Sequence, residues 1–157
     1  MGFLETLRAR LVGDTESTHP SASASTSTAN SLVPLPADSY QKVVGESHYQ
    51  PALAATAKIC RPGEDERPMF TAYLLAEPEN PYDADAIAVH SDEGKLGYLS
   101  REDAQSFRAT FAELRARGNG GATCGAFLTG GDRNPPNYGV VLRLSRPKDC
   151  EQHLGRI

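Results

Sequence analysis

The feature that most constrains the fold is the proline-rich turn at residues 77–83, Glu-Pro-Glu-Asn-Pro-Tyr-Asp, which lies between two apolar segments. Each proline fixes φ near about −65° and removes a backbone donor, so regular structure cannot run through the turn. Asn and Asp side chains also bond their own backbone in such turns. We therefore expect a stiff connection that presents an aromatic ring, Tyr82, beside a carboxylate, Asp83.

The segments on either side of this turn show the alternation of apolar and polar residues that is typical of half-buried strands. Similar short segments recur along the chain, at residues 42–46, 70–76, 86–90, 95–99, 122–129 and 138–145. We expect a mainly β protein, a small β-barrel or curled sheet of about five to six strands. One well-formed helix is expected after residues 95–99, which form the third strand when the count begins at residues 70–76.

That helix is the element the sequence predicts most clearly. Ser100 is a suitable N-cap with Asp103 three residues later, and Gly118 is a helix stop. Apolar residues at offsets of three, four and three place one face toward the core: Ala104, Phe107, Phe111 and Leu114. A shorter helix is expected over residues 52–59, with Pro51 in its first turn.

Composition divides the chain into four parts. A segment rich in Ser, Thr and Ala has too few large apolar side chains to offset the entropy of ordering. The expected parts are a short amphipathic helix at 1–12, a disordered linker at 13–39, a folded domain at 40–146 and a loose tail at 147–157. Because so short a helix is marginal alone, we expect it to dock on a protein partner or, less favourably, on a membrane surface.

Charge and cysteine content limit the function. The formal net charge is −4, which disfavours a protein that coats duplex DNA through a basic field. The three cysteines are far apart, without a Cys-x-x-Cys pair, so free thiols in a reducing cytoplasm are expected and a zinc site is not. The sequence indicates no transmembrane segment, no bound metal and no cofactor.

Three blocks in order carry a resemblance to a known family. They are Val43-Val44-Gly45, then Glu-Pro-x-Asn-Pro-Tyr-Asp-x-x-Ala-Ile-x-Val over residues 77–89, then Leu96-Gly97-Tyr98-Leu99. Together they resemble the HIRAN domain, a module at the N-terminus of certain DNA-repair helicases, over roughly residues 40–145. The resemblance implies an OB-like barrel that binds single-stranded DNA at a free 3′ end, without catalysis, in repair or replication.

The resemblance also implies roles for individual residues. Tyr82 corresponds to an aromatic that stacks on the terminal base, and Asp83 to an acid that accepts a hydrogen bond from the 3′-hydroxyl. His48 lies where the family can have an aromatic, after Ser47 where an arginine can stand. Tyr98 lies where a histidine occurs, and Arg101 where a lysine contacts phosphate. Two further aromatics are candidate contacts: Tyr49 and Tyr138.

Each candidate also fits a purely structural role. Tyr82 could lie on the barrel, Asp83 could cap backbone donors, and Tyr98 could be part of the core. At the level of the whole domain, the acidic balance and Ser47 favour an alternative, a protein-interaction module that kept the fold without a working DNA pocket. A metal-dependent enzyme using Asp83 and Asp85 is disfavoured, because no third ligand is evident, and the chain has no phosphate loop or helicase motor.

Overall fold

The computed structural model describes residues 31–63 and 65–157. The expected N-terminal helix at 1–12 and most of the expected linker, residues 13–30, lie outside the described residues. Within the described part, strands and helices follow the order β1 (Leu32–Pro34), β2 (Tyr40–Val44), η1 (Glu46–His48), α2 (Gln50–Ile59), β3 (Arg61–Pro62), β4 (Pro68–Ala76), β5 (Ile87–Ser91), β6 (Gly94–Leu99), α3 (Arg101–Ser106), α4 (Arg108–Ala116), β7 (Gly121–Gly130), β8 (Tyr138–Arg143) and α5 (Pro147–Leu154).

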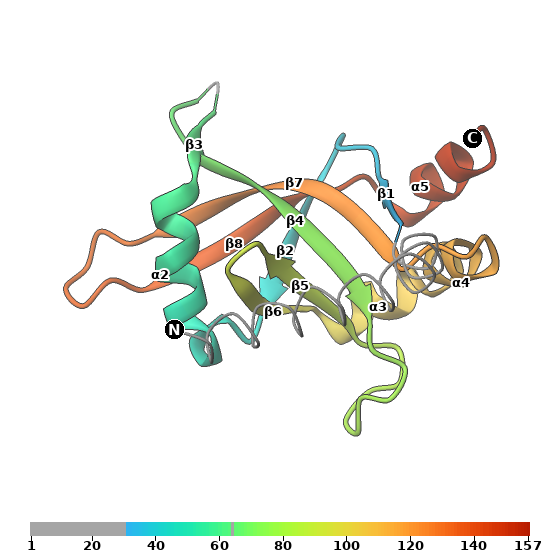
Figure 1. Cartoon of the computed structure of the whole chain (residues 1–157), viewed down its shortest axis with the longest axis horizontal. Helices are drawn as coiled ribbons and strands as arrows, with labels where there is room; N and C mark the ends of the chain where they lie inside the picture. Colours follow the sequence, from blue (N-terminus) through green and yellow to red (C-terminus); the bar gives the residue numbers. More distant parts are fainter. Residues whose placement is uncertain (1–30, 64) are drawn as a thin grey trace, which may run out of the picture.

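Six of these strands close into an antiparallel barrel. The sheet order is β1-β7-β8-β2-β6-β5-β4-β3, and a further pairing of β7 with β4 joins the two ends of the six-stranded part. β4 and β7 are the long strands that cross the molecule (Figure 1). Closure leaves these six strands without a free edge between them, which removes a route to aggregation. The predicted mainly β, OB-like barrel is confirmed.

The barrel is filled by the apolar side chains that the alternation pattern predicts to face inward. On β4, Ala72 and Leu74 are completely buried while Thr71 is exposed. Helices cover the two ends: α2 lies at one end and α3, α4 and α5 lie toward the other (Figure 1). Leu53 of α2 and Phe107, between α3 and α4, are buried and pack these helices against the barrel core. The core is therefore continuous between barrel and helices.

β6 passes unusually close to β2, and this approach requires a glycine. A Cβ placed on Gly97 would lie 2.5 Å from the carbonyl oxygen of Val44 and 2.6 Å from a methyl of Val43. Val43 pairs with Leu99 and Val44 with Tyr98 across these strands. Gly97 thereby allows the close pairing that fixes the position of its neighbour Tyr98.

Two segments expected to lack structure are ordered. Leu32–Pro34 forms β1, parallel to β7, and Leu35 is buried, so the linker ends before residue 32 and not at 39. The tail expected to be loose from 147 forms α5, beginning at Pro147, with Cys150 and Leu154 buried. In both segments a few apolar side chains at the right spacing find the barrel or α4 to pack against, which composition alone does not indicate.

The helix predicted between Ser100 and Gly118 is present but divided. Ser100 caps α3 as expected, since its Oγ accepts a hydrogen bond from the backbone N–H of Asp103 at 3.1 Å. Phe107 then has φ −86° and ψ 1°, which separates α3 from α4. The apolar face is nevertheless shared, because Ala104, Phe107, Phe111 and Leu114 are all buried. The two helices therefore cover the barrel as one element.

Candidate nucleic-acid interface

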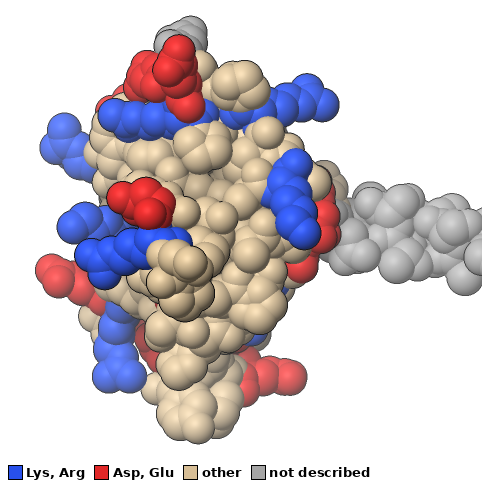
Figure 2. All heavy atoms as spheres, turned by 90° about the vertical axis from the view of Figure 1, so that its left-hand side faces the viewer, with Lys and Arg blue, Asp and Glu red and all other residues tan. Residues whose placement is uncertain are grey.

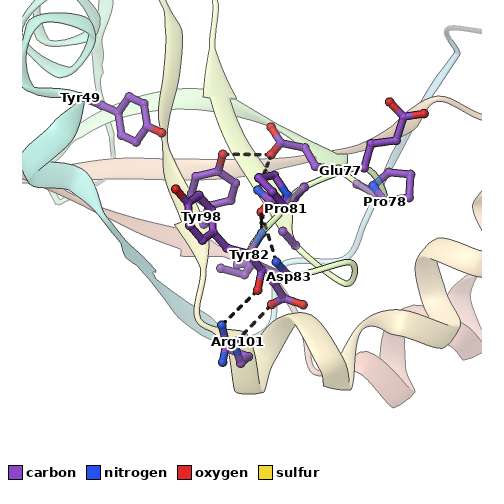
Figure 3. A pocket seen from close by; sticks show the side chains of 13 residues that line it. Tyr49, Glu77, Pro78, Pro81, Tyr82, Asp83, Tyr98 and Arg101 are labelled. Carbon is purple, nitrogen blue, oxygen red and sulfur yellow. Dashed lines mark hydrogen bonds and ion pairs between the residues drawn. The ribbon is translucent and has the colours of Figure 1, made fainter.

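A hollow lies where the 77–86 loop meets β6 and the start of α3. It is an open cavity of about 850 Å³ (Figure 3). Its walls come from five places in the chain: the residue before α2, the end of β4, the loop, the end of β6, and the first residue of α3. The lining residues are Tyr49, Ala76, Glu77, Pro78, Glu79, Asn80, Pro81, Tyr82, Asp83, Ala86, Tyr98, Leu99 and Arg101.

The loop is held by its own side chains. Asn80 Oδ1 accepts hydrogen bonds from the backbone N–H groups of Tyr82 and Asp83, at 2.9 and 3.2 Å. The amide of Asn80 also donates to Glu77 Oε2 at 3.0 Å. At the base of the loop, the Glu77 N–H donates to the carbonyl of Ala86 at 2.8 Å. These bonds and the two prolines make the turn stiff, as predicted.

Tyr82 stands at the outer end of this loop and is 86% exposed. Among the described residues its ring makes no aromatic contact within the protein, although its backbone N–H and C=O are both hydrogen-bonded. A large, exposed ring on a fixed backbone loses little conformational entropy when it stacks on a flat ligand. The alternative in which Tyr82 packs on the barrel does not fit this exposure.

Asp83 has one oxygen engaged locally and one directed at a cation. Its Oδ1 accepts the backbone N–H of Asp85 at 3.0 Å, which is the capping role that the sequence left open. Its Oδ2 lies 3.7 Å from Arg101 Nε, and the Asp83 side chain remains 21% exposed toward the cavity. The capping bond therefore fixes the orientation of the carboxylate without using both of its oxygens.

Arg101 connects the loop to α3. Its guanidinium lies 3.4 Å from the carbonyl oxygen of Tyr82, a long hydrogen bond, and near Asp83 (Figure 3). The side chain is 70% exposed, so both contacts are weak in water. Arg101 is also the first residue of α3, where free backbone N–H groups favour anions. The guanidinium can therefore turn from Asp83 to a phosphate in the cavity at little cost.

Tyr98 forms part of a three-residue polar network on the cavity wall. Its hydroxyl donates to Glu77 Oε2 at 2.9 Å and accepts from Lys95 Nζ at 2.8 Å. Lys95 also bonds Glu77 Oε1 at 2.5 Å, and its ammonium lies 4.9 Å from the Tyr98 ring centroid. Burial raises the pKa of Glu77, but hydrogen bonds from Lys95, Asn80 and Tyr98 outweigh it and hold the pKa below its ordinary value. The ion pair accordingly raises the pKa of Lys95, against the opposing effect of burial.

Glu77→Gln is expected to lower the free energy of unfolding at neutral pH by about 1–2 kcal/mol, because it removes a charged acceptor from Lys95 and Tyr98. Since the folded pKa of Glu77 is lowered, this stabilisation is complete above the unfolded pKa of about 4.3 and is lost as the pH falls through the folded pKa. Urea unfolding followed by circular dichroism at steps from pH 7 to pH 3 measures the difference between the two proteins.

The exposed Glu79 of the same loop provides the matched control. Glu79→Gln should change stability by less than about 0.5 kcal/mol at every pH. If the difference in free energy of unfolding between the wild type and Glu77→Gln stayed constant down to pH 3, the proposed stabilisation by the Glu77 network would be contradicted.

The cavity brings together five of the seven residues that the sequence singled out: Tyr82, Asp83, Tyr98, Arg101 and Tyr49. Tyr49 faces Tyr98 with ring centroids 6.4 Å apart, whereas His48 is exposed and reaches the site only through its edge contact with Tyr49. Tyr138 does not line the cavity. Its backbone N–H and C=O pair with the side-chain amide of Gln50, at 2.9 Å each, which ties β8 to the start of α2.

Lys95 is a site residue that the sequence did not indicate. The bonds of Asn80 to the backbone of the loop, in contrast, follow from the turn chemistry expected of residues 77–83. Lys95 lies at the start of β6 among alternating residues, and nothing local indicates that it faces Glu77 from 18 residues away. Only the pairing of β5 with β6 brings it there.

Comparison with known proteins identifies the family. A family model described as the HIRAN domain matches residues 37–118, more than half of the chain. The chain belongs to the HIRAN family. Among solved structures, this HIRAN protein is similar to a crystallised protein from Lactobacillus plantarum, with 25% identity, 70% of this chain and 90% of that chain covered, and a TM-score of 0.43.

A second solved structure, the HIRAN domain of human HLTF, is similar at 17% identity, with 75% of this chain and 86% of that chain covered and a TM-score of 0.38. No curated protein sequence matches this one. The family match ends at residue 118, so β7 and β8, which close the barrel of this HIRAN domain, lie beyond it. All three motif blocks and the whole loop of the cavity lie inside it.

Within the described part of this HIRAN chain, no helix is both long and apolar enough to cross a membrane. Across residues 31–63 and 65–157, no three or more His, Cys, Asp or Glu side chains gather as a metal site requires.

The face that carries α2 and the β7–β8 hairpin has uncharged residues in its middle and Lys and Arg side chains mostly toward its margins (Figure 2).

Proposed function

We propose that this HIRAN domain binds single-stranded DNA at a free 3′-hydroxyl end and performs no catalysis itself. The single observation that carries the proposal is the placement of an 86% exposed Tyr82 and the Asp83 carboxylate side by side on one stiff loop at the same cavity. Tyr82 stacks on the terminal base, which tolerates any sequence because every base has a flat face. The Asp83 carboxylate accepts a hydrogen bond from the 3′-hydroxyl.

The chemistry of this pair favours a strand end over the interior of a strand. A carboxylate repels phosphate but accepts a hydrogen bond from a hydroxyl, and Asp83 keeps its Oδ2 free of backbone donors. Arg101, 3.7 Å away, offers a positive charge for the last internucleotide phosphate. Tyr98 and Tyr49, whose rings are tilted by 59° to each other, form the aromatic wall behind the base (Figure 3). As the biological setting we propose DNA repair or replication in the cytoplasm.

The test compares two single-stranded 12-mers of the same sequence, one ending in a 3′-hydroxyl and one in a 3′-phosphate, by fluorescence anisotropy. The 3′-phosphate strand is expected to bind at least about tenfold more weakly, because its added charge faces the Asp83 carboxylate. In the Asp83→Asn variant, the difference in affinity between the two strands should be smaller. An added 5′-phosphate serves as the control and should leave the affinity unchanged. Equal affinity for the two 3′ ends would refute end recognition.

The second candidate function is a protein-interaction module. The observation that favours it is the acidic wall of the cavity, which includes Glu77 and Glu79, together with Ser47 in place of a basic residue. An exposed tyrosine beside such a wall also suits a peptide with a basic residue. If no single strand of any end chemistry binds at low salt, this second function replaces the first.

A further inference from the structure

Three arginines lie at intervals of seven residues along α3 and α4: Arg101, Arg108 and Arg115. Seven residues are close to two helical turns, so Arg108 and Arg115 share one side of α4, about 10 Å apart along it, whereas Arg101 begins α3 before the break at Phe107. Ion pairs identify that side as the one facing the loop. Arg101 lies 3.7 Å from Asp83, and Arg108 lies 4.0 Å from Asp85.

The surface between the three arginines and the loop is hollowed. Next to the 850 Å³ cavity lie two smaller ones of about 210 and 250 Å³, which both border Phe111 and Arg115 of α4. All three cavities share Ala76 and Pro78 in their walls. The three cavities therefore adjoin at the base of the loop, and each of them has at least one of the three arginines in its wall.

The charges of this arginine row are only weakly neutralised. The side chains of Arg101 and Arg108 are 70% and 74% exposed, and their carboxylate partners lie at loose distances, so neither pair contributes much in water. Arg115 forms no ion pair or hydrogen bond through its side chain within the described part of the chain. The acids on the same helices are Glu102, which is exposed, Asp103, whose carboxylate accepts a hydrogen bond from Ser100 at 2.7 Å, and Glu113, which is bonded to Arg117 at 2.8 Å.

We propose that the arginine row, Arg101, Arg108 and Arg115, binds the phosphates of the strand that leads to the bound 3′ end. This inference rests on the proposed function and adds the path of the DNA outside the end pocket. Guanidinium groups bind phosphate through paired N–H donors. The row leads from the terminal nucleotide at Arg101 to the last turn of α4. Bases along this path turn toward the cavity walls at Pro78 and Phe111.

The experiment measures the dissociation constants of a 3′-hydroxyl dinucleotide and a 12-mer at salt concentrations from 50 to 300 mM. In the wild-type protein the 12-mer should show the steeper dependence on salt, because more phosphates are bound. The double variant R108Q/R115Q is expected to reduce the slope of log K against log [salt] for the 12-mer by about 1.4, which corresponds to two lost phosphate contacts. Dinucleotide binding should not change, since it reaches only Arg101.

A second double variant, K42Q/R143Q, removes the same charge from exposed positions on the outer side of β2 and β8. It should leave the 12-mer slope within about 0.3 of wild type, and thermal melting should show that both variants fold. If both double variants reduce the slope equally, net charge alone is responsible and the row is refuted. If the dinucleotide binds but R108Q/R115Q leaves the slope unchanged, the row is refuted and the end pocket stands. If neither ligand binds the wild type, both proposals fail.

Discussion

Replacing Tyr82 by alanine is expected to weaken binding of a 3′-hydroxyl single strand by about 1–3 kcal/mol, or roughly 5- to 150-fold, without changing the melting temperature. The loss follows from the removal of the one ring that is 86% exposed at the cavity. The fold should be unaffected because the loop is held by bonds that do not use the Tyr82 side chain. Asn80 bonds the backbone N–H of Tyr82 and the carboxylate of Glu77. Anisotropy titration and thermal melting measure the two quantities.

Tyr40 provides the matched control for this experiment. It is the other strongly exposed tyrosine, at 61%, and it lies on the outer side of β2 with its ring against Phe127 at 6.1 Å. Tyr40→Ala should leave affinity within about twofold of wild type. Tyr82→Phe should also bind normally, since stacking needs the ring and not the hydroxyl. An equal loss from Tyr40→Ala, or unfolding of Tyr82→Ala, would contradict the stacking role.

The barrel strands could be predicted from the sequence because each one is specified locally. Strands such as β4 and β5 show the alternation directly, and the prolines and Asn80 between them mark the turn. The strands β1 and β3 could not be predicted in the same way. They have three and two residues, and they are strands only because β7 and β4 offer free backbone partners beside them.

The same distinction between local and tertiary information applies to the candidate site. Tyr82 and Asp83 are neighbours in the chain, so their placement together follows from a stiff turn and needs no tertiary information. The contact of Lys95 with Glu77, and the position of Arg108 beside Asp85, depend on how β6 and α4 pack against the loop. Tyr138 was a candidate because it is an aromatic residue at the start of a strand. Its backbone is bonded to the side chain of Gln50, and its ring does not line the cavity.

Leu154→Ala is expected to lower the free energy of unfolding by about 2–5 kcal/mol, although the sequence gives its segment the appearance of a loose tail. Leu154 is completely buried, as is Cys150 one helical turn before it, so α5 contributes a wall of the core and packs on α4. A cavity left at that position cannot be filled by a flexible end, because residues 147–154 are helical. Urea unfolding followed by circular dichroism measures the change.

Ile157 is the matched control, since it is an apolar residue of the same size three positions later but is 70% exposed. Ile157→Ala should cost less than about 0.5 kcal/mol. Because α5 supports the helix that carries Arg108 and Arg115, Leu154→Ala should also weaken binding of the 12-mer more than binding of the dinucleotide under conditions where the variant is still folded. Similar stability of Leu154→Ala and Ile157→Ala would mean that α5 does not pack on the core in solution, and that end of the barrel would then be covered by α3 and α4 alone.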